Sequence, residues 1–158
     1  MNTWLSPHFS LEELTATRHR ELGNRPGPAA LAGLRRLAAT LEAVRRLLGD
    51  HPVIITSGFR SGAVNRAVGG AAGSAHLRGE AADFICPRFG PPEQVCRAIA
   101  GSDIAFDQLI EEAGRWTHLA IGGAQRRQVL SWRPGEGYRP GLAACTCACG
   151  CWDCPWPG

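Results

Sequence analysis

The sequence contains no lysine, and all 17 of its basic residues are arginine. With 14 acidic residues, the formal net charge is only +3. This charge does not indicate nucleic-acid binding, which usually requires a clustered basic face. No run of about 18 apolar residues is present, so we expect no membrane span. The first eight residues lack the charged and apolar regions of a secretory signal, and we expect synthesis as a cytoplasmic chain without a leader.

The length of 158 residues and a hydrophobic content of 44% fit one globular domain with a core. We expect this domain to be a monomer. The composition changes after Trp132, where residues 133–141 are rich in proline and glycine and predict a linker. We therefore divide the chain into a domain over 1–132 and a linker with a cysteine-rich tail over 133–158.

The tail carries five of the seven cysteines in the pattern Cys-x-Cys-x-Cys-x-Cys-x-x-Cys over residues 145–154. Thiolates at this density are suited to a soft metal such as zinc or copper(I). The paired Cys-x-x-Cys spacing of a zinc ribbon is absent, and an odd number of cysteines leaves one thiol over if disulfides form. An extension that is disordered and unrelated to the domain is an equally good interpretation.

The hydrophobic pattern predicts an α+β fold with a small, mainly antiparallel sheet. A long amphipathic helix is expected from Pro28, which suits the first helical position, to a stop at Gly49. A short helix is expected after Ser10, which forms a capping box with Glu13. Further helices are expected over residues 63–68 and 92–100, and strands over 52–57, 80–85, 106–112, 116–121 and 127–132.

Two of these expected strands contain side chains that suit water better than an apolar core. Asp83 follows Ala81-Ala82 and precedes Phe84-Ile85, and His118 lies in the apolar run 116–121. A buried carboxylate is costly unless its charge is compensated. His76 precedes Asp83 by seven residues, and a catalytic zinc commonly takes three His or Asp ligands and leaves one position open. By spacing alone, His76 and Asp83 as loop or turn caps and His118 as a hydrogen-bonded core residue remain alternatives.

The motif Ser-x-His-x-x-Gly-x-Ala-x-Asp over residues 74–83 is preceded by Thr-Ser-Gly-Phe-Arg-Ser over 56–61 and followed by Trp116-x-His118. In combination these motifs resemble the zinc D-Ala-D-Ala carboxypeptidase family, which includes phage L-alanyl-D-glutamate endopeptidases. The resemblance extends from about Phe9 to about Trp132.

The resemblance implies a Zn²⁺ site formed by His76, Asp83 and His118, in a cleft on a sheet of the hedgehog and DD-peptidase type. It also implies hydrolysis of a peptide bond in peptidoglycan stem peptides, with a phage or prophage lysis enzyme as the expected setting. Because hedgehog-type domains share such a metal site, a catalytically inactive zinc-containing binding module is the alternative. A third interpretation, a thiol-rich metal-handling protein, rests on the tail.

Hydrolysis also requires a general base within hydrogen-bond reach of the attacking water. Much of the family has an acidic residue three positions before the last histidine, where this chain has Arg115. In a hairpin with a three-residue loop over 113–115, Glu112 opposes Trp116 and shares the face of His118. In a two-residue loop, Glu111 would oppose His118 instead. We favour Glu112, and solvent-exposed glutamates without a catalytic role remain an alternative.

Two further residues are candidates for substrate binding. The resemblance implies that Arg60 anchors a substrate carboxylate, with which a guanidinium pairs bidentately. An exposed arginine beside a turn is the alternative. Ser74 is a candidate for hydrogen bonding near the metal or to a substrate amide, or for capping its own loop. Cys86 and Cys96 are expected to be small core residues.

Overall fold

The computed structural model describes residues 2–142. Its helices are α1 (Leu11–Leu14), η1 (Arg20–Leu22), α2 (Pro28–Leu47), α3 (Gly62–Ala67), η2 (Ala75–Arg78) and α4 (Pro92–Ala100). Its strands are β1 (Ile54–Ser57), β2 (Ala81–Ile85), β3 (Gln108–Glu112), β4 (Trp116–Ala120), β5 (Gln128–Arg133) and β6 (Gly137–Pro140). None of these helices is both long and apolar enough to cross a bilayer.

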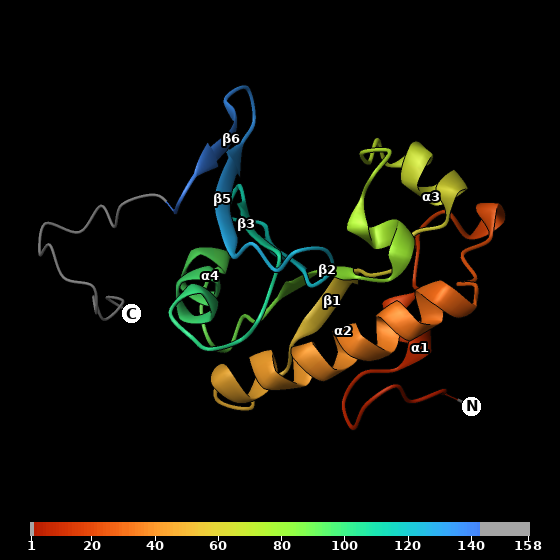
Figure 1. The fold of residues 1–158 in the computed structure, drawn as a ribbon, viewed down its shortest axis with the longest axis horizontal. Coiled ribbons are helices and arrows are strands. Elements are labelled where there is room, and N and C mark those ends of the chain that lie inside the picture. The colour runs from red at the N-terminus through yellow and green to blue at the C-terminus, as the bar shows by residue number, and fades with distance from the viewer. Residues whose placement is uncertain (1, 143–158) are drawn as a thin grey trace, which may run out of the picture.

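The strands form one sheet in the order β1-β2-β4-β3-β5-β6. Neighbouring strands are antiparallel, except that β3 and β5 run parallel. Helix α2 runs along the bottom of the molecule below β1 and β2, and α4 lies beside β3 (Figure 1). The prediction of an α+β fold with a small, mainly antiparallel sheet is confirmed.

The helix limits follow from the residues that the sequence offers at each end. Helix α2 begins at Pro28, and Gly49, just after its end, adopts a left-handed conformation with a φ of 75°. Its buried face includes Leu34, Leu37 and Leu41. In α1 the Ser10 hydroxyl accepts a hydrogen bond from the Glu13 amide at 3.2 Å, which confirms the expected cap.

The two faces of the sheet have different roles. Ala82, Phe84, Leu109 and Leu119 belong to the core cluster, together with residues of α2 and α4. Side chains alternate along a strand, so the residues between them lie on the other face of the sheet. That face carries Asp83, His118, Ile110 and Glu112. The predicted core cysteines, Cys86 and Cys96, are both buried.

The structure corrects the prediction of a linker directly after Trp132. Strand β5 continues to Arg133, and the segment 137–140 forms β6, which pairs Tyr138 with Trp132. Strand β6 therefore forms one edge of the sheet, and β1 forms the other. Gly135 and Gly137 have φ values of 78° and 76°, so these glycines form a tight turn where a flexible connection was expected. The cysteines at 145–154 lie outside the described residues, and the interpretations of the tail stay predictions.

Candidate metal centre

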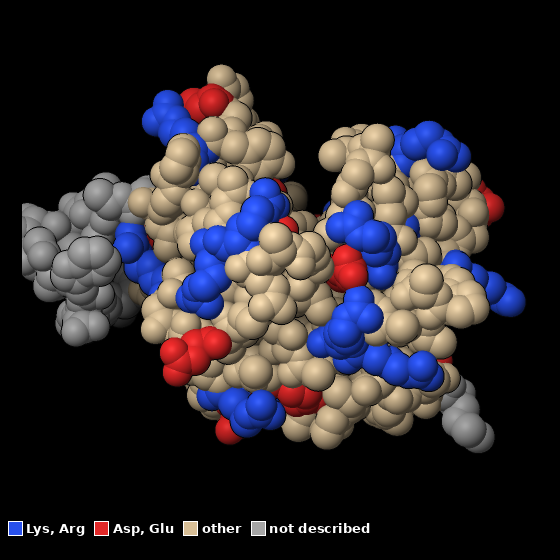
Figure 2. Space-filling model, in the orientation of Figure 1, with Lys and Arg blue, Asp and Glu red and all other residues tan. Residues whose placement is uncertain are grey.

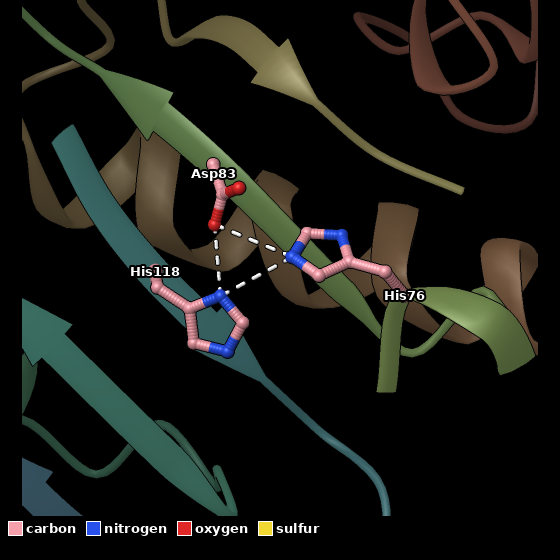
Figure 3. A group of neighbouring side chains, drawn as sticks. All are labelled: His76, Asp83 and His118. Carbon is pink, nitrogen blue, oxygen red and sulfur yellow. Dashed lines mark hydrogen bonds and ion pairs between the residues drawn. The ribbon is translucent and has the colours of Figure 1, made fainter. Parts of the chain in front are cut away.

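The three predicted ligands converge from separate elements, as Figure 3 shows. His76 lies in η2, Asp83 in β2 and His118 in β4, and Asp83 and His118 are direct partners across the β2–β4 pair. One ligand atom from each residue lies within 4.8 Å of the other two. Spacing in the sequence did not determine this convergence, because it depends on antiparallel pairing between strands 35 residues apart.

The distances identify the atoms that face one another. His118 Nδ1 lies 2.8 Å from Asp83 Oδ1, and His76 Nε2 lies 3.4 Å from the same oxygen. The two histidine nitrogens are 3.3 Å apart. His76 and Asp83 are buried, whereas His118 is partly exposed to the cleft above the sheet.

The ring of His76 is held in one orientation by a backbone carbonyl. Its Nδ1 lies 2.6 Å from the carbonyl oxygen of Gly58 and donates to it, since a carbonyl only accepts. Burial lowers the pKa of His76, which favours the neutral ring. The lone pair of Nε2 then points at the Asp83 carboxylate, so two acceptors face each other. A cation between them resolves this conflict, and a His₂Asp donor set with an orienting carbonyl behind one histidine fits zinc.

The carbonyl of Gly58 is itself fixed by the N-terminal part of the chain. Gly58 packs so closely on α1 that a Cβ added to it would lie 2.3 Å from the carbonyl oxygen of Leu14. The next amide, that of Phe59, donates to the same Leu14 oxygen at 2.7 Å. The glycine of the Thr-Ser-Gly-Phe-Arg-Ser motif thus links α1 to the orientation of a metal ligand.

Asp83 stays ionised despite its burial. Burial would raise its pKa, but hydrogen bonding, to which His118 contributes most, outweighs this effect and holds the pKa below its usual range. Arg60 adds a further contact, since its Nη2 lies 3.0 Å from Asp83 Oδ2. The guanidinium also donates to Ser57 at 3.1 Å and to the buried Asn65 at 3.4 Å.

Arg60 therefore contacts a predicted metal ligand directly, which sequence reasoning missed. The proximity of Arg60 to Asp83 depends on the β1–β2 pairing, where Ser57 lies opposite Asp83. No local signal in the sequence reports this pairing. The role of Arg60 toward a substrate carboxylate stays a prediction.

The β3–β4 hairpin has the register that places Glu112 on the metal face. Glu112 pairs with Trp116, and Ile110 pairs with His118, as expected for a loop over 113–115. The alternative two-residue loop, which would have placed Glu111 opposite His118, is wrong. Ala113 and Gly114 both have positive φ, with values of 52° and 69°, and these backbone conformations let the chain reverse direction within the loop over 113–115.

The two neighbouring glutamates have opposite surroundings. Glu112 lines the cleft with His76 and His118, and burial is the main cause that raises its pKa. Glu111 is only 1% exposed and lies on the core face, where it accepts from the Gly114 amide and pairs with Arg133. The carboxylate beside the candidate metal is thus that of Glu112.

Ser74 caps the helix that carries His76. Its hydroxyl accepts a hydrogen bond from the His76 amide at 3.3 Å, so the capping alternative is realised. Ser74 also lines the cleft, and its role in substrate binding stays a prediction.

A cleft of about 470 Å³ lies over the three ligands and Glu112. In Figure 2 the surface is hollowed between the end that carries β5 and β6 and the end that carries α3. Asp107, Arg126 and Tyr138 also line this cleft. Sequence reasoning did not associate these three residues with the site. Tyr138 was missed because its segment was interpreted as a linker.

Comparison with known proteins shows what the chain is similar to. A family model described as Peptidase M15 matches residues 7–120, a range that contains all three ligands and Glu112. The zinc D-Ala-D-Ala carboxypeptidase of Streptomyces albus G is 49% identical over 44 residues. These residues make up 28% of this chain and only 17% of that protein, so the chain matches a small part of this relative's length.

Proposed function

The chain belongs to the Peptidase M15 family, and from this premise we propose that it is a zinc-dependent peptidase acting on peptidoglycan stem peptides. The bond that it hydrolyses involves a D-amino acid. The observation that carries the proposal is the convergence of His76, Asp83 and His118 beside the carboxylate of Glu112 in one cleft.

The chain's own residues account for metal binding. His76 binds through Nε2, His118 through Nδ1 and Asp83 through Oδ1, the atoms that face one another at 2.8 to 3.4 Å. Zinc held by these three residues would supply Lewis-acid chemistry, polarising a peptide carbonyl and lowering the pKa of water towards ~7. The Gly58 carbonyl and Arg60 keep His76 and Asp83 in orientation for this task.

Glu112 acts as the general base. Its carboxylate accepts a proton from the attacking water and returns it to the amine nitrogen that leaves. Burial raises the pKa of Glu112 above its ordinary value, which strengthens it as a base toward the attacking water. Glu112 thereby substitutes for the acidic residue that much of the family has at the position of Arg115.

Arg60 and Ser74 are proposed to bind the substrate from the opposite side of the cleft. The guanidinium of Arg60 has five N–H groups, and three protein acceptors are within hydrogen-bond distance of it. At least one N–H therefore remains to donate to a substrate carboxylate, while the others hold Asp83 and the turn after β1. The Ser74 hydroxyl is placed to accept from a substrate amide or to contact a ligand of the metal.

Both exopeptidase and endopeptidase activity are compatible with this site. The setting that we propose is cell-wall lysis by a phage or prophage enzyme, with either a D-Ala-D-Ala carboxypeptidase or an endolysin-type endopeptidase activity. The basic Arg115 is the observation that favours the second candidate, a zinc-containing module that binds cell wall or protein without hydrolysis. The carboxylate of Glu112 in the cleft favours hydrolysis.

Mass spectrometry of purified peptidoglycan after incubation with the protein tests the proposal. We expect shortened or separated stem peptides, and we expect none when a chelator is present or when Glu112 is replaced in Glu112→Gln. The matched control is Glu111→Gln, which changes the adjacent glutamate on the other face of β3. Intact stems after incubation with the zinc-loaded wild type, together with measurable binding to the wall, would establish the binding module instead.

A further inference from the structure

A row of four side chains crosses the sheet through the proposed general base. Trp116 on β4 pairs with Glu112 on β3, Glu112 pairs with Trp132 on β5, and Trp132 pairs with Tyr138 on β6. Residues directly opposite each other on paired strands share a face of the sheet. Tyr138 therefore lies on the face of Glu112 and His118, two strands beyond the general base.

Tyr138 forms part of the cleft wall. It lines the same cleft as Glu112 and the metal ligands, and 60% of the residue is exposed. Partial burial raises the pKa of its hydroxyl, and the negative charges of Glu112 and Asp83 add to this rise. Tyr138, Glu112 and Asp83 thus line one and the same cleft.

Strand pairing fixes the backbone position from which the Tyr138 ring projects. Strand β6 is paired with β5 at four positions, and β5 is paired with β3 at five. The β5–β6 turn is further held by an ion pair between Arg139 and Glu136 at 3.2 Å. Side chains on strands are positioned more accurately than side chains on loops.

The cleft has an apolar group on its other wall as well. Val68, just after α3, lines the cleft and is 49% exposed. The centre between these walls is polar, with His76, His118 and Glu112. A ligand that crosses the cleft thus has polar groups at its centre and an apolar surface at each side, as a peptide chain with small apolar side chains requires.

We propose that Tyr138 is a substrate-contacting residue that selects peptides by length. Two strand spacings of ~4.8 Å place its backbone roughly 10 Å from that of Glu112, and an extended peptide rises ~3.3 Å per residue. The ring thus packs against a peptide residue about three positions from the bond that is cut. This inference rests on the proposed function of the same site, and Tyr138 lies beyond the residues that the family model matches.

Steady-state kinetics on two sugar-free substrates test this role. One is a stem pentapeptide, and the other is the dipeptide that contains the bond cut in it. For Tyr138→Ala we expect KM for the pentapeptide to rise about ten-fold, as for a well-packed aromatic contact, while kcat and the dipeptide kinetics stay near wild type. Tyr138→Phe, which keeps the ring, should restore most of the affinity. Trp4→Ala is the matched control, because Trp4 is 61% exposed and does not line the cleft.

Calorimetric binding of the pentapeptide to zinc-loaded full-length protein separates this inference from the proposed function. If no peptide is hydrolysed but Tyr138→Ala weakens binding about ten-fold, the contact is supported and the peptidase proposal fails. Equal effects on both peptides, or no effect on either, would overturn the length-selecting role. An effect that appears only with sugar-bearing muropeptides would also overturn it, because the contact would then be with the glycan.

Discussion

The two faces of the β3–β4 hairpin each carry a glutamate, but the two glutamates lie in opposite environments. On the core face, Glu111 is buried with an amide and an arginine as partners, and its strand partner Thr117 is fully buried. On the site face, the carboxylate of Glu112 has no hydrogen bond or ion pair with any residue in 2–142, and the side chain of His118 lies beside those of His76 and Asp83.

This difference shows how a sheet separates stability from chemistry. A buried carboxylate with satisfied partners contributes to folding and is unavailable to a substrate. A half-buried carboxylate without partners is less stable in its ionised form and has lone pairs available for a proton. The alternation of side chains alone places Glu111 and Glu112 on opposite faces and so in these different roles.

The largest difference is expected for metal binding. His118→Ala removes a ligand on the site face, and we expect zinc to fall from about one per chain to none, with loss of all hydrolysis. Thr117→Val changes the neighbouring core-face residue, whose hydroxyl lies 3.4 Å from the Pro92 carbonyl. It should keep zinc and lose about 1 kcal/mol of folding stability.

Elemental analysis of the chain cut after Leu142 measures this without the cysteine tail. The cut is placed there because an end at Trp132 would remove β6 from the sheet. Full zinc content and activity in His118→Ala would show that the metal is held elsewhere.

The second-largest difference is expected in kcat, between variants of the two glutamates. Glu112→Gln keeps the shape of the side chain and removes the basic oxygen, so kcat should fall roughly 10²–10⁴-fold while zinc is retained. Glu111→Gln should keep kcat near wild type. Release of peptide from purified stems measures both variants. If the two variants exchanged these results, the carboxylate of Glu112 would not be the base.

For folding stability we expect the opposite order, with Glu111→Gln losing more than Glu112→Gln. Glu111→Gln removes the charge that pairs with Arg133, whose side chain is partly exposed, and we expect a loss of about 1–3 kcal/mol. Chemical denaturation of both variants measures the free energy of unfolding. An unchanged free energy of unfolding in Glu111→Gln would mean that the ion pair between Glu111 and Arg133 makes no net contribution to folding.

A smaller effect with a defined pH dependence is expected for Glu112→Gln without zinc. The pKa of Glu112 is raised in the folded protein, so folding favours its protonated form. Wild-type stability therefore decreases as pH rises from the unfolded-state value of about 4.5 through the folded-state pKa. The variant lacks this loss and should be more stable than wild type at pH 7 by less than about 1 kcal/mol.

Thermal unfolding of chelator-treated protein at pH 4 and pH 7 tests this sign. The advantage of Glu112→Gln should be present at pH 7 and absent at pH 4. A variant that is less stable at pH 7 would show that Glu112 has a stabilising partner in its ionised form.

The smallest change is expected from removing the tail. Ending the chain after Leu142 leaves both faces of the sheet intact, and specific activity on muropeptides should stay within about two-fold of the full chain, well below the effect of losing an acid–base group. Circular dichroism checks that the fold is kept. Loss of most activity in a folded shortened chain would place tail residues in the site.

The sequence predicted those features that depend on local patterns. Pro28 and Gly49 gave the limits of α2, and the three-residue turn gave the register of Glu112 with Trp116. Asp83 and His118 could be singled out as candidate ligands because each interrupts an apolar strand, and the family resemblance joined them with His76 as the predicted set.

The features that the sequence did not reveal depend on distant pairings. Arg60 meets Asp83 through the β1–β2 pair, and the Gly58 carbonyl meets His76 across 18 residues. Strand β6 was missed because Gly137 and Pro140 occupy two of its four positions and weaken its propensity. As an edge strand its burial pattern is also mostly exposed, so no alternation marked Tyr138.

The close packing of Gly58 on Leu14 connects the position of α1 to the orientation of His76, a predicted metal ligand. The carbonyl that orients His76 belongs to a residue pressed against α1, so the docked position of α1 and the high-affinity geometry of the ligand occur together. Thermodynamic linkage is reciprocal, and any factor by which docking tightens zinc binding is the factor by which zinc tightens docking. If docking of α1 tightens zinc binding, loss of zinc would weaken that docking to the same degree.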